Sequence, residues 1–427
     1  MRRESFGGIA QVGPLGYLLN PYACALLERL TRPLPPRVLL EYCHETLSSD
    51  DLQRFLSSCR ATNLIEIASD ESSARARLYC ARNKNPTLHF QSPLAVEIEI
   101  TNKCFRHCSY CAYESGPTPK IIRENELSTD QWINVISNLE REGVMALEFT
   151  GGDPFVRDDA LDLLRHAADL GLVLLINSDL SILNRQHLEG LRSLKSLVSV
   201  QTSLDGATPA SCDLTRGHGG FKTLMRQLAV LNDAGLPVSV GSTIHRHNAT
   251  EVETIAELVA SKGASRFYIG PMYPAGRATT LNDLVVSSEQ WDLAVNQYVN
   301  VVKKGFIAPA DRRWYELAAH YEPLHNPVHD QLYITGRATR SVRLDPHGNV
   351  YISAKLRQWH PRFWIVGNIL QFDLGTVWRE SRLLNELRSY GPQFNEFDGV
   401  DVRTVAREEH LRSDHVDELQ FVNLRSG

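Results

Sequence analysis

The chain has 427 residues, of which 43% are hydrophobic and 22% are charged, and its formal net charge is -5. This length predicts two or three domains, and the composition is that of a globular protein. The acidic balance argues against a nucleic-acid-binding surface. No apolar run is long enough for a transmembrane helix, and the N-terminus lacks the apolar core of a signal peptide. We therefore expect a cytoplasmic protein that binds neither nucleic acid nor membrane.

Residues 1–80 predict a small N-terminal domain. A strand pair is expected over Ile9–Leu19, with a turn at Gly13-Pro14-Leu15-Gly16. Three helical segments follow, the first opened by Asn20-Pro21, and Asn63–Ile67 is expected to return as a strand. This order is typical of a winged helix. Because the segment contains no basic helix, DNA binding is disfavoured.

After a linker over residues 81–93, strand and helix patterns alternate through residues 94–305. An amphipathic helix, for example, is expected over Thr129–Glu142, opened by Ser128 or Thr129. Six repeats of this kind predict a parallel sheet curved into a partial (β/α)6 barrel, so the fold class is α/β. The expected strands are Val96–Thr101, Met145–Thr150, Leu172–Asn177, Leu197–Leu204, Val238–Ile244 and Arg266–Gly270.

Three cysteines, Cys104, Cys108 and Cys111, directly follow the first of these strands. Thiolates at this spacing can face one point, which suits a metal ion or an iron–sulfur cluster. A structural zinc ion usually takes four ligands. His107 could supply the fourth, but it lies between two ligands in a tight loop. Three cysteines alone favour a [4Fe–4S] cluster with one open iron, and a zinc site is the alternative.

The same pattern, with Tyr110 before the last cysteine, resembles the radical S-adenosylmethionine (radical SAM) enzymes. The resemblance implies that the open iron binds the amino and carboxylate groups of SAM. An electron from a flavodoxin- or ferredoxin-type donor then leads to cleavage of SAM, and a 5′-deoxyadenosyl radical abstracts hydrogen from the substrate. The cofactors perform this chemistry, while the protein binds, orients and shields them.

Two further motifs of this family follow the second and third strands. Gly151-Gly152-Asp153 resembles its Gly-Gly-Glu motif, which binds the SAM amino group. Glycines let backbone approach the ligand, and a carboxylate neutralises an ammonium group. Asn177 and Ser178 occupy the place of the family's Thr-Asn-Gly site.

The fourth to sixth strands are also followed by candidate site residues. Ser203 is a candidate for the ribose or the carboxylate of SAM, and Arg216 for the carboxylate. Asp205 could instead be a structural cap. Cys212 could donate a hydrogen atom to a substrate radical, as in peptide epimerases, or be an incidental loop thiol. We interpret the two histidines of the His245–His247 pair as polar loop positions rather than metal ligands, and Pro274–Arg277 resembles a turn of the peptide-maturase subfamily.

Residues 306–395 resemble the SPASM extension of radical SAM peptide maturases, an α+β region. The resemblance rests on a predicted hairpin over Val342–Ser353 and on the stretches Val366–Ile369 and Leu374–Trp378. In that family, cysteines after the hairpin hold auxiliary clusters, but here Ser353 takes the first such position and no cysteine follows Cys212. We therefore expect a single [4Fe–4S] cluster in the chain. Residues 396–427 are expected to form a helical tail.

The stretch Gly16–Ala23 resembles the RiPP recognition element, which grips a precursor's leader peptide as an added strand. Together these features predict a radical SAM maturase that installs a crosslink or an epimerised residue in a ribosomally made precursor peptide. A radical SAM enzyme acting on a small metabolite is the alternative. A peptide carrier without catalysis is disfavoured by the intact cysteines and the Gly151-Gly152-Asp153 turn.

Overall fold

The computed structural model describes residues 2–4, 7–12, 15–19, 90–117, 126–272, 275–304, 308–309, 341–352 and 365–389. The chain divides into two compact units, Met1–Gln91 and Ser92–Gly427. The first contains an antiparallel three-stranded sheet of β1 (Arg2–Glu4), β2 (Gly7–Val12) and β3 (Leu15–Leu19). The predicted hairpin is confirmed as β2 and β3, and β1 is an addition to it. The helices and the Asn63–Ile67 strand predicted in this unit lie outside the described residues.

The second unit is built on six parallel strands in sequential order, which confirms the α/β fold and all six predicted strands. A short strand, β10 (Ala308–Pro309), extends the sheet beyond the sixth. Their carboxyl ends lie along one edge of the sheet, so the loops that follow them are brought together. The six strands are β4 (Ala95–Glu99), β5 (Ala146–Thr150), β6 (Val173–Asn177), β7 (Leu197–Ser203), β8 (Val238–Ile244) and β9 (Arg266–Pro271).

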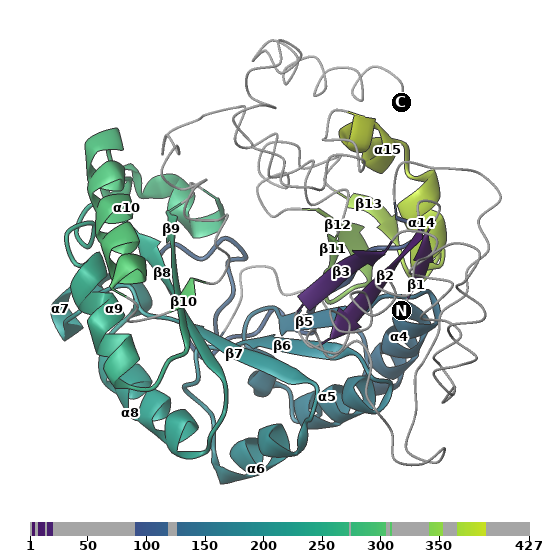
Figure 1. Ribbon diagram of the computed structural model, residues 1–427, viewed down its shortest axis with the longest axis horizontal. Helices are drawn as coiled ribbons and strands as arrows, with labels where there is room; N and C mark the ends of the chain where they lie inside the picture. The colour runs from purple at the N-terminus through teal and green to yellow at the C-terminus, as the bar shows by residue number, and fades with distance from the viewer. Residues whose placement is uncertain are drawn as a thin grey trace, which may run out of the picture. The chain divides into compact units, whose positions relative to one another are not determined.

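Helices cover the outer face of this curved sheet (Figure 1). The first begins after Ser128, whose side chain accepts from the Gln131 N–H while the Gln131 side chain accepts from the Ser128 N–H. This capping box decides the predicted start in favour of Ser128 over Thr129. The helices are α4 (Thr129–Arg141), α5 (Ala160–Asp169), α6 (Arg185–Ser193), α7 (Pro209–Arg216), α8 (Gly220–Asp233), α9 (Val252–Ser261) and α10 (Ser288–Lys303), with 3-10 turns η1 (Pro154–Val156), η2 (Gly276–Thr280) and η3 (Asn282–Leu284).

The C-terminal hairpin continues the barrel's own sheet. Strand β11 (Ser341–Leu344) pairs in parallel with β4, and β12 (Asn349–Tyr351) and β13 (Ile365–Asn368) follow in antiparallel order, making ten strands in all. The predicted hairpin is confirmed, but its attachment to β4 was not foreseen. Two short helices, α14 (Leu374–Glu380) and α15 (Arg382–Ser389), come next. Ser353 and the tail predicted over 396–427 lie outside the described residues.

A buried ion pair joins this hairpin to the barrel. Val96 and Ile98 on one face of β4 are fully buried, and Glu97 and Glu99, also buried, point to the opposite face because side chains alternate along a strand. An Nη atom of Arg343 on β11 lies 2.5 Å from the Glu97 carboxylate, which is its register partner. Charges removed from water need such a partner. The interior of the barrel is therefore polar beside β4.

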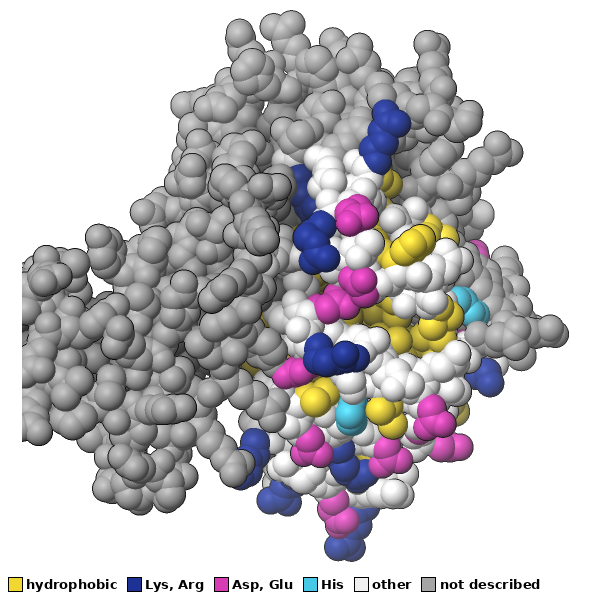
Figure 2. Space-filling model, turned by 90° about the vertical axis from the view of Figure 1, so that its right-hand side faces the viewer, with side chains coloured by type: hydrophobic (Ala, Val, Ile, Leu, Met, Phe, Trp, Pro, Cys, Tyr) yellow, Lys and Arg dark blue, Asp and Glu magenta, His cyan; other side chains and the backbone are white. Residues whose placement is uncertain are grey.

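The surface drawn in Figure 2 carries both signs of charge. Lysine and arginine side chains are interspersed there with acidic ones, and hydrophobic side chains lie between them. In the part of the chain that the structure describes, no helix combines the length and apolar character needed to cross a membrane.

Candidate functional site

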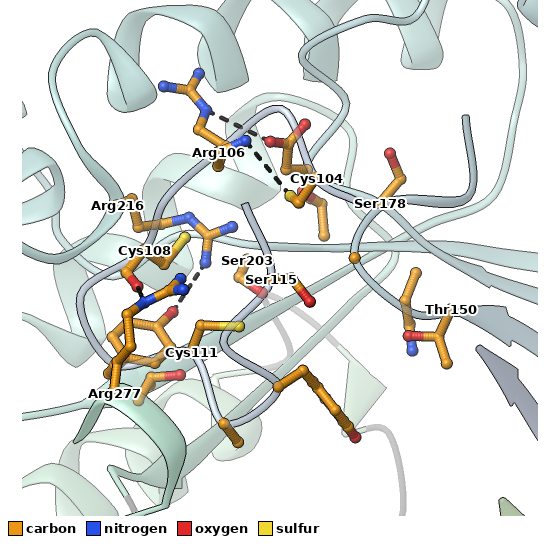
Figure 3. Close-up of a pocket in the computed structure, with 18 of the residues that line it drawn as sticks. Cys104, Arg106, Cys108, Cys111, Ser115, Thr150, Ser178, Ser203, Arg216 and Arg277 are labelled. Carbon is orange, nitrogen blue, oxygen red and sulfur yellow. Dashed lines mark hydrogen bonds and ion pairs between the residues drawn. The ribbon is translucent and has the colours of Figure 1, made fainter. Parts of the chain in front are cut away.

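A cavity of about 330 Å³ opens at the carboxyl ends of the barrel strands (Figure 3). Its wall includes residues at the ends of five successive strands: Thr150, Asn177, Ser203, Thr243 and Pro271. This volume is in the range of small-molecule sites. Most of the predicted site residues meet here, namely Cys104, Tyr110, Cys108, Cys111, Gly152, Asn177, Ser203 and Arg216. Gly151, Asp153 and Cys212 do not line it.

Backbone contacts hold the cysteine-bearing loop against the Gly151-Gly152-Asp153 turn. The Gly152 N–H donates to the Thr101 carbonyl at 2.7 Å, and the Asp153 N–H donates to the Lys103 carbonyl at 2.8 Å. A Cβ atom on Gly152 would lie 1.9 Å from the Lys103 oxygen, which no side chain can tolerate. Gly152 is therefore required for the contact between the two loops, whatever it does for a ligand.

The three thiols of this loop are free and half-buried. Burial raises the pKa of each, and for Cys104 the neighbouring carboxylates Asp179 and Asp153 raise the pKa further. Positive charge acts in the other direction: Arg216 lowers the pKa of Cys108 and Arg277 that of Cys111. Thiolates buried in this way need a cationic group for compensation, and iron supplies such a charge.

These residues fit an iron–sulfur cluster better than a single ion. Nowhere in the described ranges are three or more His, Cys, Asp or Glu side chains arranged to hold one metal ion. His107, the fourth ligand of the alternative zinc site, is not part of the cavity wall. A [4Fe–4S] cluster takes one thiolate on each of its irons, so its three ligands need not converge on one atom. Cys104, Cys108 and Cys111 would hold such a cluster in this cavity.

Tyr110 and Arg216 share one carboxylate partner, Asp205. The Tyr110 hydroxyl donates to Asp205 at 2.5 Å, and an Nη atom of Arg216 donates to the Tyr110 oxygen at 2.8 Å and lies 3.4 Å from Asp205. Asp205 also accepts the Thr243 N–H at 2.8 Å and is fully buried, which confirms it as a structural cap. Burial raises the pKa of Tyr110, so the hydroxyl keeps its proton as a donor.

Asp153 is occupied by protein donors. Its fully buried carboxylate accepts the Phe155 N–H at 3.0 Å, the Ser178 hydroxyl at 2.8 Å and the Asp179 N–H at 2.9 Å. Burial, and then the charge of Asp179, raise its pKa to about 7. The carboxylate thus joins the turn after β5 to the loop after β6, and its predicted contact with the SAM amino group remains a prediction.

Cys212 lies apart from the cavity. It belongs to α7 rather than to a loop, its side chain is fully buried, and burial raises its pKa to about 11. A hydrogen-atom donor must reach the substrate radical, and Cys212 has no contact with the cavity that would support this role. This burial is typical of a core thiol, and the hydrogen-donor role of Cys212 remains a prediction.

The two histidines after β8 also have structural surroundings. His245 is fully buried, its ring nitrogen accepts the His247 N–H at 3.3 Å, and its own N–H donates to Asn248 at 2.7 Å. Burial lowers the pKa of His245, so its ring is neutral. These contacts shape the loop after β8, as expected for loop positions rather than metal ligands.

Sequence reasoning missed several residues of the cavity wall. Arg106 lies 3.5 Å from Asp179, and its backbone N–H donates to the Cys104 sulfur at 3.4 Å. Tyr113, Ser115, Asp179 and Arg277 are further examples. A signal existed for two of them: Asp179 directly follows the Asn177-Ser178 motif, and Arg277 ends the Pro274–Arg277 turn.

Comparison with known proteins places the site in a family context. Residues 98–259 match the Radical SAM superfamily. The AdoMet-dependent heme synthase of Nitratidesulfovibrio vulgaris is 30% identical over 48% of this chain and 55% of its own length. The PqqA peptide cyclase of Rhodopseudomonas palustris is 34% identical over 42% and 47%. The chain thus matches about half the length of these relatives.

The fold is similar to that of SuiB from Streptococcus suis, which has been solved with its precursor peptide SuiA and with S-adenosylmethionine. The TM-score is 0.66, at 14% identity, over 91% of this chain and 88% of SuiB. The matched residues 98–259 contain the three cysteines and the ends of β5 to β8 that line the cavity. Residues 98–259 are therefore similar to the Radical SAM superfamily, and the fold around them is similar to one that has been solved with S-adenosylmethionine.

Proposed function

We propose that this chain modifies a ribosomally made precursor peptide by radical chemistry, installing a crosslink or an epimerised residue. The observation that carries the proposal is the extent of the likeness to SuiB, a protein solved with its precursor peptide. The likeness covers 91% of the chain, whereas the superfamily match spans only residues 98–259. It therefore includes parts outside the radical SAM domain. Sequence similarity to PqqA peptide cyclase supports the same class of substrate.

In this proposal the cavity at the barrel mouth is the active site. Cys104, Cys108 and Cys111 would hold the [4Fe–4S] cluster, and Gly152, Asn177, Ser203 and Arg216 line the space next to it for SAM. When bound, these cofactors supply a carbon-centred radical that removes a hydrogen atom from the substrate. The chain's own side chains orient SAM and exclude water. The electron would come from a flavodoxin- or ferredoxin-type donor in the cytoplasm.

The N-terminal unit would bind the leader part of the precursor. In the described three-stranded sheet β2 is central, and β1 and β3 are the edges. An edge strand presents unpaired N–H and C=O groups, to which an extended peptide can add as a further strand. The unit would then act as a RiPP recognition element that delivers the precursor to the barrel.

A single cluster is part of the proposal. Besides the three cysteines of the motif, the sequence contains Cys212 and four cysteines before residue 93. None of its cysteines lies after the barrel. Without an auxiliary cluster to accept an electron, the reaction returns its electron to the SAM cluster, leaves it on the product, or is redox-neutral. Anaerobic reconstitution should then give about four iron atoms per chain. About twice that amount would contradict the proposal.

A second candidate is a small metabolite. The AdoMet-dependent heme synthase is 30% identical over 206 residues, and the PqqA peptide cyclase of Rhodopseudomonas palustris is 34% identical over 181 residues. The similarity to the heme synthase would fit a tetrapyrrole substrate.

Co-expression with any short open reading frame found beside the gene separates the two candidates. Mass spectrometry of the recovered peptides should show a loss of two hydrogens for a crosslink, or deuterium uptake from D2O without other mass change for an epimerisation. The same tests with Cys104→Ala should show neither. If no flanking peptide changes, while a tetrapyrrole supports formation of 5′-deoxyadenosine above the substrate-free rate, the peptide proposal is wrong and the second candidate stands.

A further inference from the structure

Arg277 holds the backbone of two of the three cluster cysteines. Its backbone N–H donates to the Cys111 carbonyl at 3.1 Å, and its side-chain Nε donates to the Cys108 carbonyl at 2.8 Å. Figure 3 shows its side chain lying beside Cys108 and Cys111. The turn that contains Arg277, at least 166 positions farther along the sequence, thus stabilises the last turn of the cysteine loop.

The turn that carries Arg277 is fitted closely to this loop. Gly276 has φ of 57°, and a Cβ atom there would lie 2.5 Å from the carbonyl oxygens of both Ala112 and Cys111. Only glycine is accommodated at this approach. Residues on both sides of this turn form a buried apolar cluster of Met272, Ala278, Leu284 and Val285, and Tyr110 and Leu281 pack against it.

One N–H donor group of the Arg277 guanidinium is unpaired among the described residues. Nη2 of Arg277 is buried and has no hydrogen-bond partner among the described residues. The side chain lines the cavity together with the three thiols. Buried N–H donors are almost always paired, so an unpaired one at a cavity wall marks a place where an acceptor from a ligand is expected.

The charges around the thiols are unevenly distributed. Asp179 and Asp153 act on Cys104, and on Cys108 the charge of Arg216 is opposed by Asp205 and Asp179. On Cys111 the charge that acts is that of Arg277. Arg216 is already paired with Asp205 at 3.4 Å. No ion pair of Arg277 with a carboxylate is found in the described ranges, so no adjacent carboxylate there offsets its charge.

We propose that Arg277 is a positioning residue for the iron–sulfur cluster, and that its positive charge makes the cluster easier to reduce. The inference rests on the proposed function in that it assumes the cluster. One electron from a low-potential donor would add one negative charge to the cluster that the three thiolates would hold. A fixed positive charge beside them stabilises the reduced form, and hydrogen bonds to sulfur do the same. The free Nη2–H is placed to make such a bond.

The test is a redox titration of the anaerobically reconstituted full-length chain without substrate. Electron paramagnetic resonance detects the reduced cluster at each potential. Arg277→Gln keeps a donor for the Cys108 carbonyl but removes the charge, and Arg277→Lys keeps the charge. At the wild-type midpoint potential, the ratio of reduced to oxidised cluster should fall by about tenfold in Arg277→Gln. Arg277→Lys should stay near wild type. Arg185→Gln, at a side chain that is 92% exposed, is the matched control and should change nothing.

Partial loading does not obscure the result, because the resonance signal comes only from chains that hold a cluster. An unchanged midpoint in Arg277→Gln would overturn the proposal. An unchanged midpoint potential together with weakened SAM binding would also overturn the proposal, because it would show that the guanidinium of Arg277 binds SAM. Complete loss of iron in both Arg277 variants would leave a structural role only and overturn the electrostatic one. Absence of any cluster signal in the wild type would instead refute the proposed function.

Discussion

The hydroxyl of Tyr110 donates a 2.5 Å hydrogen bond to the carboxylate of Asp205, 95 residues farther along the chain. The same carboxylate lies 3.4 Å from Arg216 and accepts the backbone N–H of Thr243. A single buried aspartate thus fastens the cysteine loop to α7 and to the end of β8. This arrangement fixes the aromatic residue before the last cysteine, and with it the geometry of the cavity.

Asp205→Asn should destabilise the chain more than Tyr110→Phe. The first removes the charge opposite the buried Arg216 and should cost about 3–5 kcal/mol of unfolding free energy. The second removes one hydrogen bond and should cost about 1–2 kcal/mol. Urea unfolding of the iron-free chain measures both. Equal costs would show that Arg216 does not depend on Asp205 for its charge balance.

Substitution of the four cysteines of the second unit should separate them into two classes. Ala at Cys104, Cys108 or Cys111 should abolish iron binding and the formation of 5′-deoxyadenosine from SAM. Cys212→Ala should keep both and cost about 1 kcal/mol of stability, because this thiol is buried in α7 away from the cavity. Loss of product with normal SAM cleavage in Cys212→Ala would restore the hydrogen-donor role.

Gly152→Ala should displace the cysteine loop, because the added Cβ would lie 1.9 Å from the Lys103 carbonyl oxygen. We expect iron incorporation after reconstitution to fall at least severalfold. Gly270→Ala is the matched control, since a Cβ at Gly270 on β9 meets no atom within 4 Å. Iron analysis of the two variants side by side is sufficient. Normal iron content in Gly152→Ala would mean that the two loops can separate without harm to the site.

The iron-free chain should lose stability through Asp153 as the pH rises. Burial and Asp179 raise the pKa of this carboxyl from 3.8 to about 7, so between these values the folded state binds more protons than the unfolded state. The free energy of unfolding therefore falls with rising pH over this window, by up to about 1 kcal/mol per pH unit.

The contribution of Asp153 is full below about pH 4 and is lost as the pH passes through about 7. Asp153→Asn cannot titrate and should lack this slope, even though its own stability is lower because the amide has one acceptor oxygen and cannot serve Phe155 as well as Ser178 and Asp179. Urea unfolding of both proteins at several pH values provides the comparison. Parallel pH profiles for the two proteins would assign the slope to other groups.

Much of the barrel could be predicted because its signals are local. Each strand from β4 to β9 is a short apolar run between turn residues, and the amphipathic helix after Ser128 has its cap in the sequence. The three cysteines share one loop, and the topological rule for parallel strands then places the motifs after β5, β6 and β7 at the same edge. For these reasons the place of the cavity and the cysteine side of its wall followed from the order of residues.

The remaining features depend on contacts between distant segments, which periodicity does not encode. The pairing of β11 with β4 joins residues about 245 positions apart, and the Arg343–Glu97 ion pair becomes visible only with that register. The burial of Cys212 depends on how α7 packs. Its position in the sequence alone could therefore not show whether its thiol is buried in the core or faces the cavity.

The sequence by itself determined the partial barrel, the three-thiol loop and the chemistry that its ligands suit, because spacing along the chain and residue type are local properties. Only the tertiary structure decided which side chains share the cavity. It showed that Asp153 and Asp205 hold loops together, that Cys212 lies outside the cavity wall and that Arg277 contacts the cysteine loop. Such roles depend on burial and on the partner that a charge finds, and both arise only when distant segments meet.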